Sequence, residues 1–202
     1  MTKRASAGRR TVGIILAAGS SSRMGRPKQL LPYRGKPLLQ HTLDLAAPLL
    51  PEVIVVLGHA ADEIQSALTF PSNARAVLNP DYASGQGASL RAGLASAGDG
   101  WSSAVILLGD QPGIGAEVLR MVLEEHKRSG APVVRTAYAG VPGHPVVLEQ
   151  SVWQELGADS GDVGARAWIA MHPERVATIA LPSPPPIEVD TEEDYLRLLE
   201  TE

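Results

Sequence analysis

Residues 16–28 combine small side chains with positive charges directly after a short apolar run. Small residues let a ligand approach the backbone, and successive N–H groups can form a concave site for phosphate oxygens. Arg23 adds a planar fork for two phosphate oxygens, and Lys28 adds a compact charge on a flexible stem. The segment is therefore a candidate anion site, with a flexible, solvated basic loop as the alternative. It reads Leu16-Ala17-Ala18-Gly19-Ser20-Ser21-Ser22-Arg23-Met24-Gly25-Arg26-Pro27-Lys28.

The spacing of the glycines in this loop excludes two common phosphate-binding motifs. Gly19 and Gly25 have five residues between them, and neither Lys-Ser nor Lys-Thr follows Gly25, so this is not a Walker-type loop. The loop does not read Gly-x-Gly-x-x-Gly either, which removes the main sequence support for a dinucleotide-binding domain.

Two aspartates are candidates for holding a divalent cation. Asp110 follows an apolar run and Gly109, which places its carboxylate at the end of an expected strand. Mg²⁺ prefers oxygen ligands and keeps several waters while it bridges phosphates, and Mn²⁺ is its natural substitute. Asp190 supplies a second carboxylate if Ile187–Asp190 is a short strand. The alternatives are a turn at Asp110 and a helix N-cap at Asp190.

A second polar loop, residues 79–89, follows another expected strand and could wrap a base and ribose. Gly85 allows unusual backbone dihedrals, and Ser89 offers a hydroxyl near the start of a helix. The alternative is a simple turn followed by a helix cap.

Three further residues have both a functional and a structural interpretation. His144 lies between Gly143 and Pro145, where it either shapes a second-substrate pocket or serves as a structural histidine. Asp162 and Arg166 either cap and begin a helix or line the same pocket.

Composition excludes several classes of protein. There is no cysteine, which rules out disulfides, zinc–thiolate sites, iron–sulfur clusters and cysteine nucleophiles. Residues 1–36 hold nine Lys or Arg and no acid, which leaves nine basic against 22 acidic residues in the rest of the chain. That acidic remainder would repel a polyanion, so no nucleic-acid partner is expected.

No membrane or export segment is expected. No apolar run approaches the roughly 18 residues that a membrane span needs. Residues 9–19 resemble a signal peptide superficially, but the short, β-branched run Val12–Ala17 fits a buried first strand better. We expect a cytoplasmic protein with a disordered basic tail, residues 1–10, and a single domain, residues 11–202.

Short apolar runs alternate with stretches of helical periodicity. The runs are nearly continuous in Val, Ile and Leu, which is typical of strands covered by helices on both faces. The expected strands are 12–17, 53–57, 74–78, 104–108, 133–137, 146–148 and 176–181. The expected helices lie near 38–47, 61–68, 88–97, 115–129, 163–171 and 191–200, with starts at Pro37, Ser89 or its neighbours, Asp162 and Thr191 and a C-terminal cap at Gly130.

This alternation predicts an α/β fold with a doubly wound, mostly parallel sheet. The run 143–148 follows 133–137 too closely for a crossover helix, so we expect it to pair antiparallel at an edge or in a small subsheet. Ligands of such sheets bind beyond the carboxyl ends of the strands. The residues after Ala17, after Leu108 and around Asp190 are therefore expected to meet.

Several of these motifs, taken in order, resemble the nucleotidyltransferases of the molybdenum cofactor pathway, the family of molybdenum cofactor cytidylyltransferase. The resemblance spans about residues 12–198 and is carried by Leu-Ala-Ala-Gly-x-Ser-x-Arg-Met-Gly-x-x-Lys and Gly109-Asp110-Gln111-Pro112. It also includes Asn79-Pro80, Gly87-Ala88-Ser89-Leu90, Gly143-His144-Pro145, Gly161-Asp162-x-Gly164-Ala165-Arg166 and Asp190-Thr191-x-x-Asp194. Where relatives often have Met, this chain has Gln86.

The resemblance implies a Rossmann-like nucleotidyltransferase fold and transfer of CMP from CTP to molybdopterin that carries molybdenum, with release of pyrophosphate. Ala18 favours CTP, because guanylyl-transferring relatives tend to read Leu-Ala-Gly-Gly there. A molybdoenzyme is the implied downstream partner. The implied catalytic residues are Arg23, Lys28 and Asp110, with Asp110 and Asp190 on the metal. The implied nucleotide-binding residues are Leu16, Ala17, Ala18, Gly19, Arg23, Lys28, Asn79, Gly85 and Ser89, and the second-substrate residues are His144, Asp162 and Arg166.

Three other functions remain open at this stage. One is a guanylyltransferase or another nucleotidyltransferase with a different phosphate acceptor. The second is an NAD(P)H-dependent oxidoreductase on a related fold. The third is a non-catalytic module that presents the cofactor to a molybdoenzyme.

Overall fold

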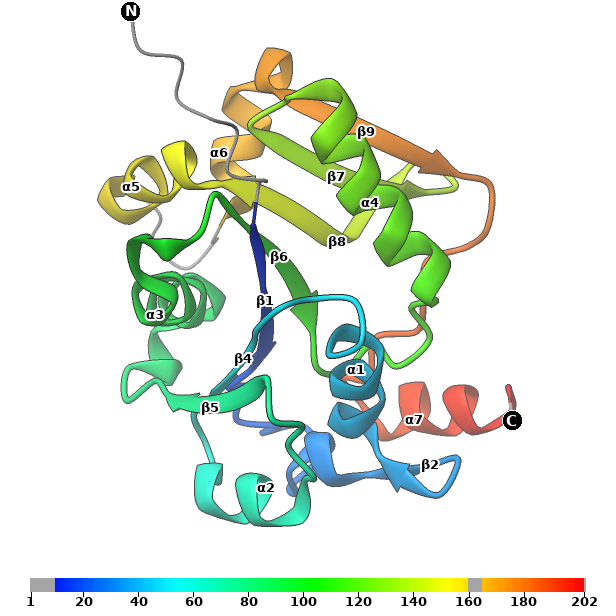
Figure 1. The fold of residues 1–202 in the computed structure, drawn as a ribbon. Helices are drawn as coiled ribbons and strands as arrows, with labels where there is room; N and C mark the ends of the chain where they lie inside the picture. The colour runs from blue at the N-terminus through cyan, green and yellow to red at the C-terminus, as the bar shows by residue number, and fades with distance from the viewer. Residues whose placement is uncertain (1–9, 160–164, 202) are drawn as a thin grey trace, which may run out of the picture.

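A seven-stranded sheet forms the centre of the computed structural model, which describes residues 10–159 and 165–201 (Figure 1). Its strand order is β5-β4-β1-β6-β8-β7-β9. The strands are β1 (Thr11–Ala17), β4 (Val53–Leu57), β5 (Ala74–Leu78), β6 (Ser103–Leu108), β7 (Val133–Tyr138), β8 (Val141–Glu149) and β9 (Val176–Leu181). A separate antiparallel pair consists of β2 (Pro32–Tyr33) and β3 (Lys36–Pro37).

All the strands of the large sheet except β8 run in the same direction. β1 pairs in parallel with β4 and β6, β4 with β5, and β7 with β9, whereas β8 is antiparallel to both β6 and β7. The predicted mostly parallel α/β fold is therefore confirmed. The antiparallel pairing of 143–148 is also confirmed; of the two expected places, an edge or a small subsheet, the edge is wrong, because β8 lies between β6 and β7. The crossover from β6 to β7 skips one position, and the tight turn at Ala139–Gly140 folds β8 back into that gap.

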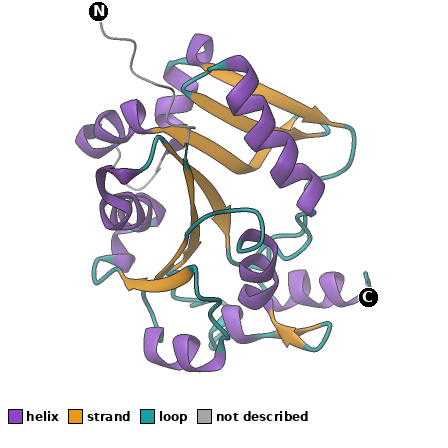
Figure 2. Cartoon of the chain, in the orientation of Figure 1, coloured by secondary structure: helices purple, strands orange, loops and turns teal. Residues whose placement is uncertain are grey.

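Helices cover both faces of the sheet (Figure 2). Apolar side chains of α3, α5 and α6 pack on one face, and those of α1, α2 and α4 pack on the other. The helices are α1 (Leu38–Ala46), α2 (Ala61–Ala67), α3 (Gln86–Ala97), α4 (Ala116–Ser129), α5 (Gln150–Asp159), α6 (Ala165–Met171) and α7 (Glu192–Leu199).

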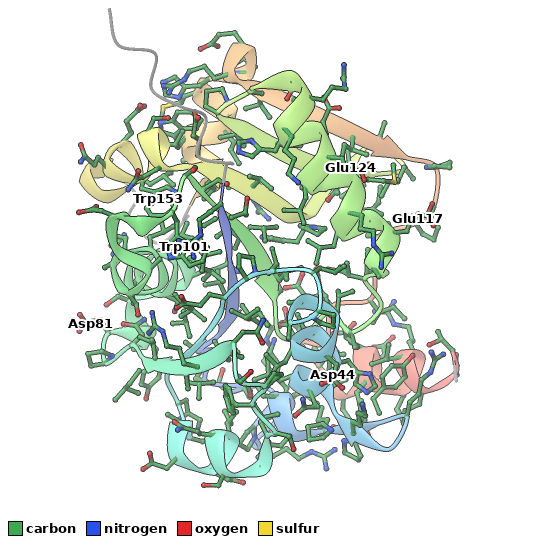
Figure 3. All side chains as sticks on the ribbon, viewed as in Figure 1. Asp44, Asp81, Trp101, Glu117, Glu124 and Trp153 are labelled. Carbon is green, nitrogen blue, oxygen red and sulfur yellow. The ribbon has the colours of Figure 1, made fainter. Side chains whose placement is uncertain are left out.

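The central strands β1, β4 and β6 are almost entirely apolar and buried because each of their two faces meets helices. Ile14 of β1 packs in the α3 cluster and the next residue, Ile15, packs in the α1 cluster, and both are fully buried. Trp101 belongs to the cluster that contains Ile14, and Trp153 of α5 packs against that cluster; both residues are labelled in Figure 3. Glu117 points outward from α4, as the same view shows.

Several expected boundaries differ from the structure. α3 begins at Gln86 after Gly85, not at Ser89, because Gly85 adopts a φ of 97° that turns the chain into the helix. Residues 187–190 form no strand, contrary to the short strand that we expected. The β2–β3 hairpin and α5 were not expected from the sequence.

The two ends of the described chain are held by different contacts. Residues 1–9 of the predicted tail lie outside the described residues, whereas the Arg10 guanidinium lies 4.3 Å from the ring centroid of Trp101. Near the C-terminus, α7 packs against the β2–β3 hairpin through Tyr195 and Leu198. Within residues 10–159 and 165–201, no helix has both the length and the hydropathy needed to cross a membrane.

Candidate active site

The site begins where the parallel strands β1 and β6 end side by side. Leu16 pairs with Leu108, and the N–H of Gly109 donates to the carbonyl of Leu16 at 3.0 Å. A Cβ at residue 109 would lie 2.8 Å from Leu39 Cδ1 and 3.0 Å from Ala17 Cβ. Glycine is needed here because the backbone passes this close to α1 and β1, and that passage sets Asp110 beside the loop after Ala17.

One backbone hydrogen bond and one helix cap place residues 187–190 beside Asp110. The N–H of Val189 donates to the carbonyl of Asp110 at 3.1 Å. Thr191 caps α7 by accepting from the N–H of Asp194, whose carboxylate accepts from the N–H of Thr191 in return. The N-cap is therefore Thr191, which leaves the side chain of Asp190 free of the capping role.

Lys28 lies between the two predicted aspartates. Its Nζ is 2.6 Å from Asp110 Oδ2 and 2.6 Å from Asp190 Oδ1. Arg23 Nη2 donates to the other oxygen of Asp190 at 3.0 Å. The structure therefore brings together the two cations and the two aspartates that the sequence singles out. They form direct ion pairs and do not face each other across an open cleft.

Glu188 is a third carboxylate that the sequence analysis missed. Ligand oxygens of Asp110, Glu188 and Asp190 all lie within 4.8 Å of one another, and we call these residues the carboxylate cluster. Gln111 Nε2 donates to Glu188 Oε2 at 3.0 Å. A sequence signal existed, because residues two apart in an extended segment share a face, which puts Glu188 beside Asp190.

Burial and neighbouring charges shift the pKa values in this cluster. Burial raises the pKa of Asp110 against the opposing effect of Lys28. Burial, then the charges of Asp110 and Asp190, raise the pKa of Glu188. Burial alone would lower the pKa of Lys28, but the two aspartates outweigh it and raise that pKa. Burial would also raise the pKa of Asp190, but Lys28 and Arg23 outweigh it and lower that pKa.

The anion loop is folded by a buried glutamine that the sequence analysis also missed. Gln29 Nε2 donates to the carbonyls of Ala17 and Gly19 at 2.8 and 3.3 Å. The backbone N–H of Lys28 donates to Ser21 Oγ at 3.1 Å. Nothing lies within 4 Å of a Cβ built at Gly19. These internal hydrogen bonds fix the backbone of the loop, and Gly19 faces open space.

A cavity of about 450 Å³ opens at this loop and contains most of the predicted nucleotide-binding residues. Arg23 and Asn79 are not part of its lining. The Asn79 side chain is buried, donates to Ser89 Oγ at 3.1 Å and accepts from the N–H of Asp81 at 3.0 Å. These hydrogen bonds hold the loop around Ser89, and the predicted contact of Asn79 with the nucleotide stays a prediction. The predicted residues that line the cavity are Leu16, Ala17, Ala18, Gly19, Lys28, Gly85, Ser89, Asp110 and Asp190.

A second cavity of about 580 Å³ adjoins the first. Its walls include the predicted residues His144 and Arg166 together with Arg135, which the sequence analysis did not name; Asp162 lies outside the described residues. Burial, reinforced by the charge of Arg166, lowers the pKa of His144 to about 4, so this histidine is neutral at pH 7. Four residues line both cavities, namely Leu16, Gln86, Leu108 and Glu188.

Comparison with known proteins identifies the family. The model of the MobA-like NTP transferase domain matches residues 13–176. The chain belongs to this family. MobA-like relatives include nicotine blue oxidoreductase of Paenarthrobacter nicotinovorans, 35% identical over 201 residues that cover 93% of this chain and 95% of that protein. Molybdenum cofactor cytidylyltransferase of Escherichia coli (strain K12) is 29% identical over 137 residues, which cover 68% of this chain and 69% of that protein.

Solved structures of other proteins have the same architecture. Rv0371c from Mycobacterium tuberculosis, in complex with manganese, aligns with a TM-score of 0.78 at 32% identity, over 96% of this chain and 100% of that one. A nucleotidyl transferase from Methanothermobacter thermautotroptrophicus aligns with a TM-score of 0.79 at 25% identity, over 96% of this chain and 100% of that one. The resemblance to molybdenum cofactor nucleotidyltransferases is thereby confirmed at the level of the family.

Proposed function

We propose that this MobA-like protein transfers CMP from CTP to the terminal phosphate of molybdopterin that carries molybdenum, with release of pyrophosphate. The observation that carries the proposal is the meeting of two cavities at the carboxylate cluster. Glu188 belongs to both cavity walls, while Asp110 and Asp190 line only the smaller one. Two substrates bound in these cavities would bring their reacting groups together at the cluster, as a group transfer requires.

The smaller cavity suits the nucleoside triphosphate. Gly19 leaves room for phosphate oxygens next to backbone N–H groups, and Lys28 and Arg23 supply positive charge at the same end. Gly85 and Ser89 also line this cavity, and they would hold the base and ribose. Ala18 supports CTP over GTP, because guanylyl-transferring relatives carry glycine at this position.

The carboxylate cluster fits a divalent cation such as Mg²⁺ or Mn²⁺. Asp110 Oδ1 is buried and has no hydrogen-bond partner among residues 10–159 and 165–201, so one hard oxygen ligand is available for a metal. Asp110, Asp190 and Glu188 would hold the ion. A bound cation would neutralise charge on the phosphates of the nucleotide and on the leaving pyrophosphate.

The larger cavity suits the acceptor. Arg166 and Arg135 offer positive charge, and apolar residues of β6 and β8 form a surface for a ring system. The acceptor phosphate is ionised at neutral pH, so its oxygen attacks the α-phosphorus and the bond to pyrophosphate breaks without a general base. His144, neutral at pH 7, would shape this cavity and not transfer a proton. The proposal locates the reaction in the cytoplasm and includes a molybdoenzyme as recipient of the product.

A second candidate function is NAD(P)H-dependent oxidoreduction. It is favoured by the similarity to nicotine blue oxidoreductase, which extends over 201 residues. Hydride transfer, however, does not require a cluster of three carboxylates that could hold a metal ion at a cavity lined by Lys28. The loop after β1 also lacks the Gly-x-Gly-x-x-Gly pattern of dinucleotide-binding domains.

The test is to incubate the protein with Mg²⁺, molybdopterin carrying molybdenum and each nucleoside triphosphate in turn, and to measure pyrophosphate. The proposal expects release with CTP that depends on the acceptor. Release with GTP only would move the assignment to guanylyl transfer. No release with any nucleotide, together with oxidation of NADH or NADPH in the presence of nicotine blue, would replace it by the second candidate.

A further inference from the structure

Lys28 occupies the position in the carboxylate cluster that a metal ion would need. Its Nζ lies 2.6 Å from one oxygen of Asp110 and 2.6 Å from one oxygen of Asp190, and its side chain is only 11% exposed. Arg23 pairs with the second oxygen of Asp190 at 3.0 Å from an exposed position. Three of the four oxygens of these two aspartates therefore already contact a cation of the protein itself.

We infer that Lys28 is an internal counter-ion that closes the metal site until a nucleoside triphosphate draws it away. The inference rests on the proposed function, because it concerns the same site, and it adds an order of events. A cation that arrives alone must compete with an ammonium group for the same two oxygens. A triphosphate in the smaller cavity gives Lys28 and Arg23 new anionic partners and so releases both aspartates.

The position of Lys28 on the chain makes such an exchange feasible. Lys28 begins a short helical turn, Lys28–Leu30, whose backbone is fixed by the contact with Ser21 and by the neighbouring Gln29. Its side chain lines the smaller cavity together with Gly19. Because a lysine has four rotatable side-chain bonds, Nζ can move from the aspartates to a phosphate in this cavity without movement of the loop.

Linked binding of this kind has a measurable consequence. Competition from the Lys28 ammonium group lowers the affinity for metal in the absence of nucleotide, and a bound nucleotide restores that affinity by drawing Lys28 away. Couplings between two sites are typically about 5- to 150-fold in affinity. Removal of the ammonium group should therefore raise the affinity of the nucleotide-free protein for metal by a factor in this range.

The test uses Mn²⁺ alone, without nucleotide or acceptor, and follows the electron paramagnetic resonance signal of free Mn²⁺ during titration of the protein. Lys28→Met should bind Mn²⁺ at least fivefold more tightly than the wild type, and Arg23→Gln should show a smaller increase. Arg26→Gln is the matched control, because Arg26 lies in the same loop but pairs with Glu192 at 2.9 Å, away from the aspartates. Its affinity should equal that of the wild type.

Unchanged or weaker Mn²⁺ binding by folded Lys28→Met would overturn the inference. If circular dichroism shows that this variant does not fold, the Arg23→Gln variant provides the test. A higher affinity for Mn²⁺ than that of both the wild type and Arg26→Gln supports the inference, and an equal affinity overturns it. The titration contains no substrate, so its outcome is independent of whether the protein releases pyrophosphate from CTP.

Discussion

At the scale of single residues, the chemistry depends on Asp110. Its carboxylate is nearly buried, pairs with Lys28 and keeps one oxygen without a hydrogen-bond partner in the described part of the chain. Asp110→Asn should slow CMP transfer by about 10²- to 10³-fold, the usual loss when one charged transition-state contact is removed. The rate of pyrophosphate release measures this loss of activity. Asp44→Asn is the control, because Asp44 lies on α1 and pairs with Lys36 of β3, not with Lys28. Rates within a few-fold of the wild type for Asp110→Asn would contradict its assigned role.

Glu188 carries a separate prediction. Glu188→Gln removes one of three candidate metal ligands while the hydrogen bond from Gln111 can persist. The variant should need a higher Mg²⁺ concentration for half-maximal activity and should approach the wild-type rate at saturating Mg²⁺. Glu192→Gln changes a nearby exposed carboxylate that pairs with Arg26 and should leave the Mg²⁺ titration unchanged. Coincident titrations for Glu188→Gln and the wild type would exclude Glu188 as a ligand.

His144 predicts a pH dependence of stability. Its pKa is about 4 in the folded protein, compared with an ordinary value of 6.5. Between these values the unfolded chain binds a proton that the folded protein does not, so the free energy of unfolding should fall as the pH drops from 6.5 to 4. Urea denaturation at pH 7 and pH 5 should show a smaller loss for His144→Gln than for the wild type. Equal losses would show that His144 does not contribute.

The residue types in the sequence were sufficient to find part of this site. Lys28, Asp110 and Asp190 were identified because charged side chains followed apolar runs at the expected edge of the sheet. Gln29 and Gln111 were not identified, because a side-chain amide that donates a hydrogen bond to a backbone carbonyl or a carboxylate produces no pattern in the sequence. Asn79 had the residue type of a ligand-binding side chain, but its hydrogen bonds are used inside the protein.

At the scale of elements, the cap of α7 positions Asp190. Thr191→Ala removes the hydroxyl that accepts from Asp194, which should lower the free energy of unfolding by about 1 kcal/mol and raise the Mg²⁺ concentration needed for activity. Thermal denaturation and a Mg²⁺ titration measure the two effects. Thr191→Ser keeps the hydroxyl and should resemble the wild type. A loss of stability in the alanine variant with an unchanged Mg²⁺ requirement would separate the cap from the site.

The strands could be predicted from the sequence where helices bury both faces of the sheet. β1, β4 and β6 are nearly continuous in Val, Ile and Leu because helices cover both faces. The place of β8 inside the sheet was not predictable, because strand order depends on which gap a crossover leaves open. The two-residue strands β2 and β3 are too short for any periodicity, and the start of α3 depends on the backbone of Gly85.

At the scale of the whole molecule, the fold brings three distant parts of the chain to one edge of the sheet. The loop after β1, the end of β6 and the segment before α7 meet at the carboxylate cluster, and two cavities open from it. Basic residues are in excess near the N-terminus, which could suggest a polyanion partner. The contact between these three parts of the chain explains this excess in part. Lys28 and Arg23 neutralise aspartates that come much later in the sequence.

The most direct test of this arrangement is a crystal structure with Mn²⁺ and a CTP analogue whose α–β bridge cannot be cleaved. The anomalous signal of manganese locates the ion without assumptions. The account predicts a peak within coordination distance of Asp110 and Asp190, with Lys28 and Arg23 on the triphosphate. An ion bound elsewhere, with Lys28 still paired to both aspartates and the nucleotide outside the smaller cavity, would contradict it.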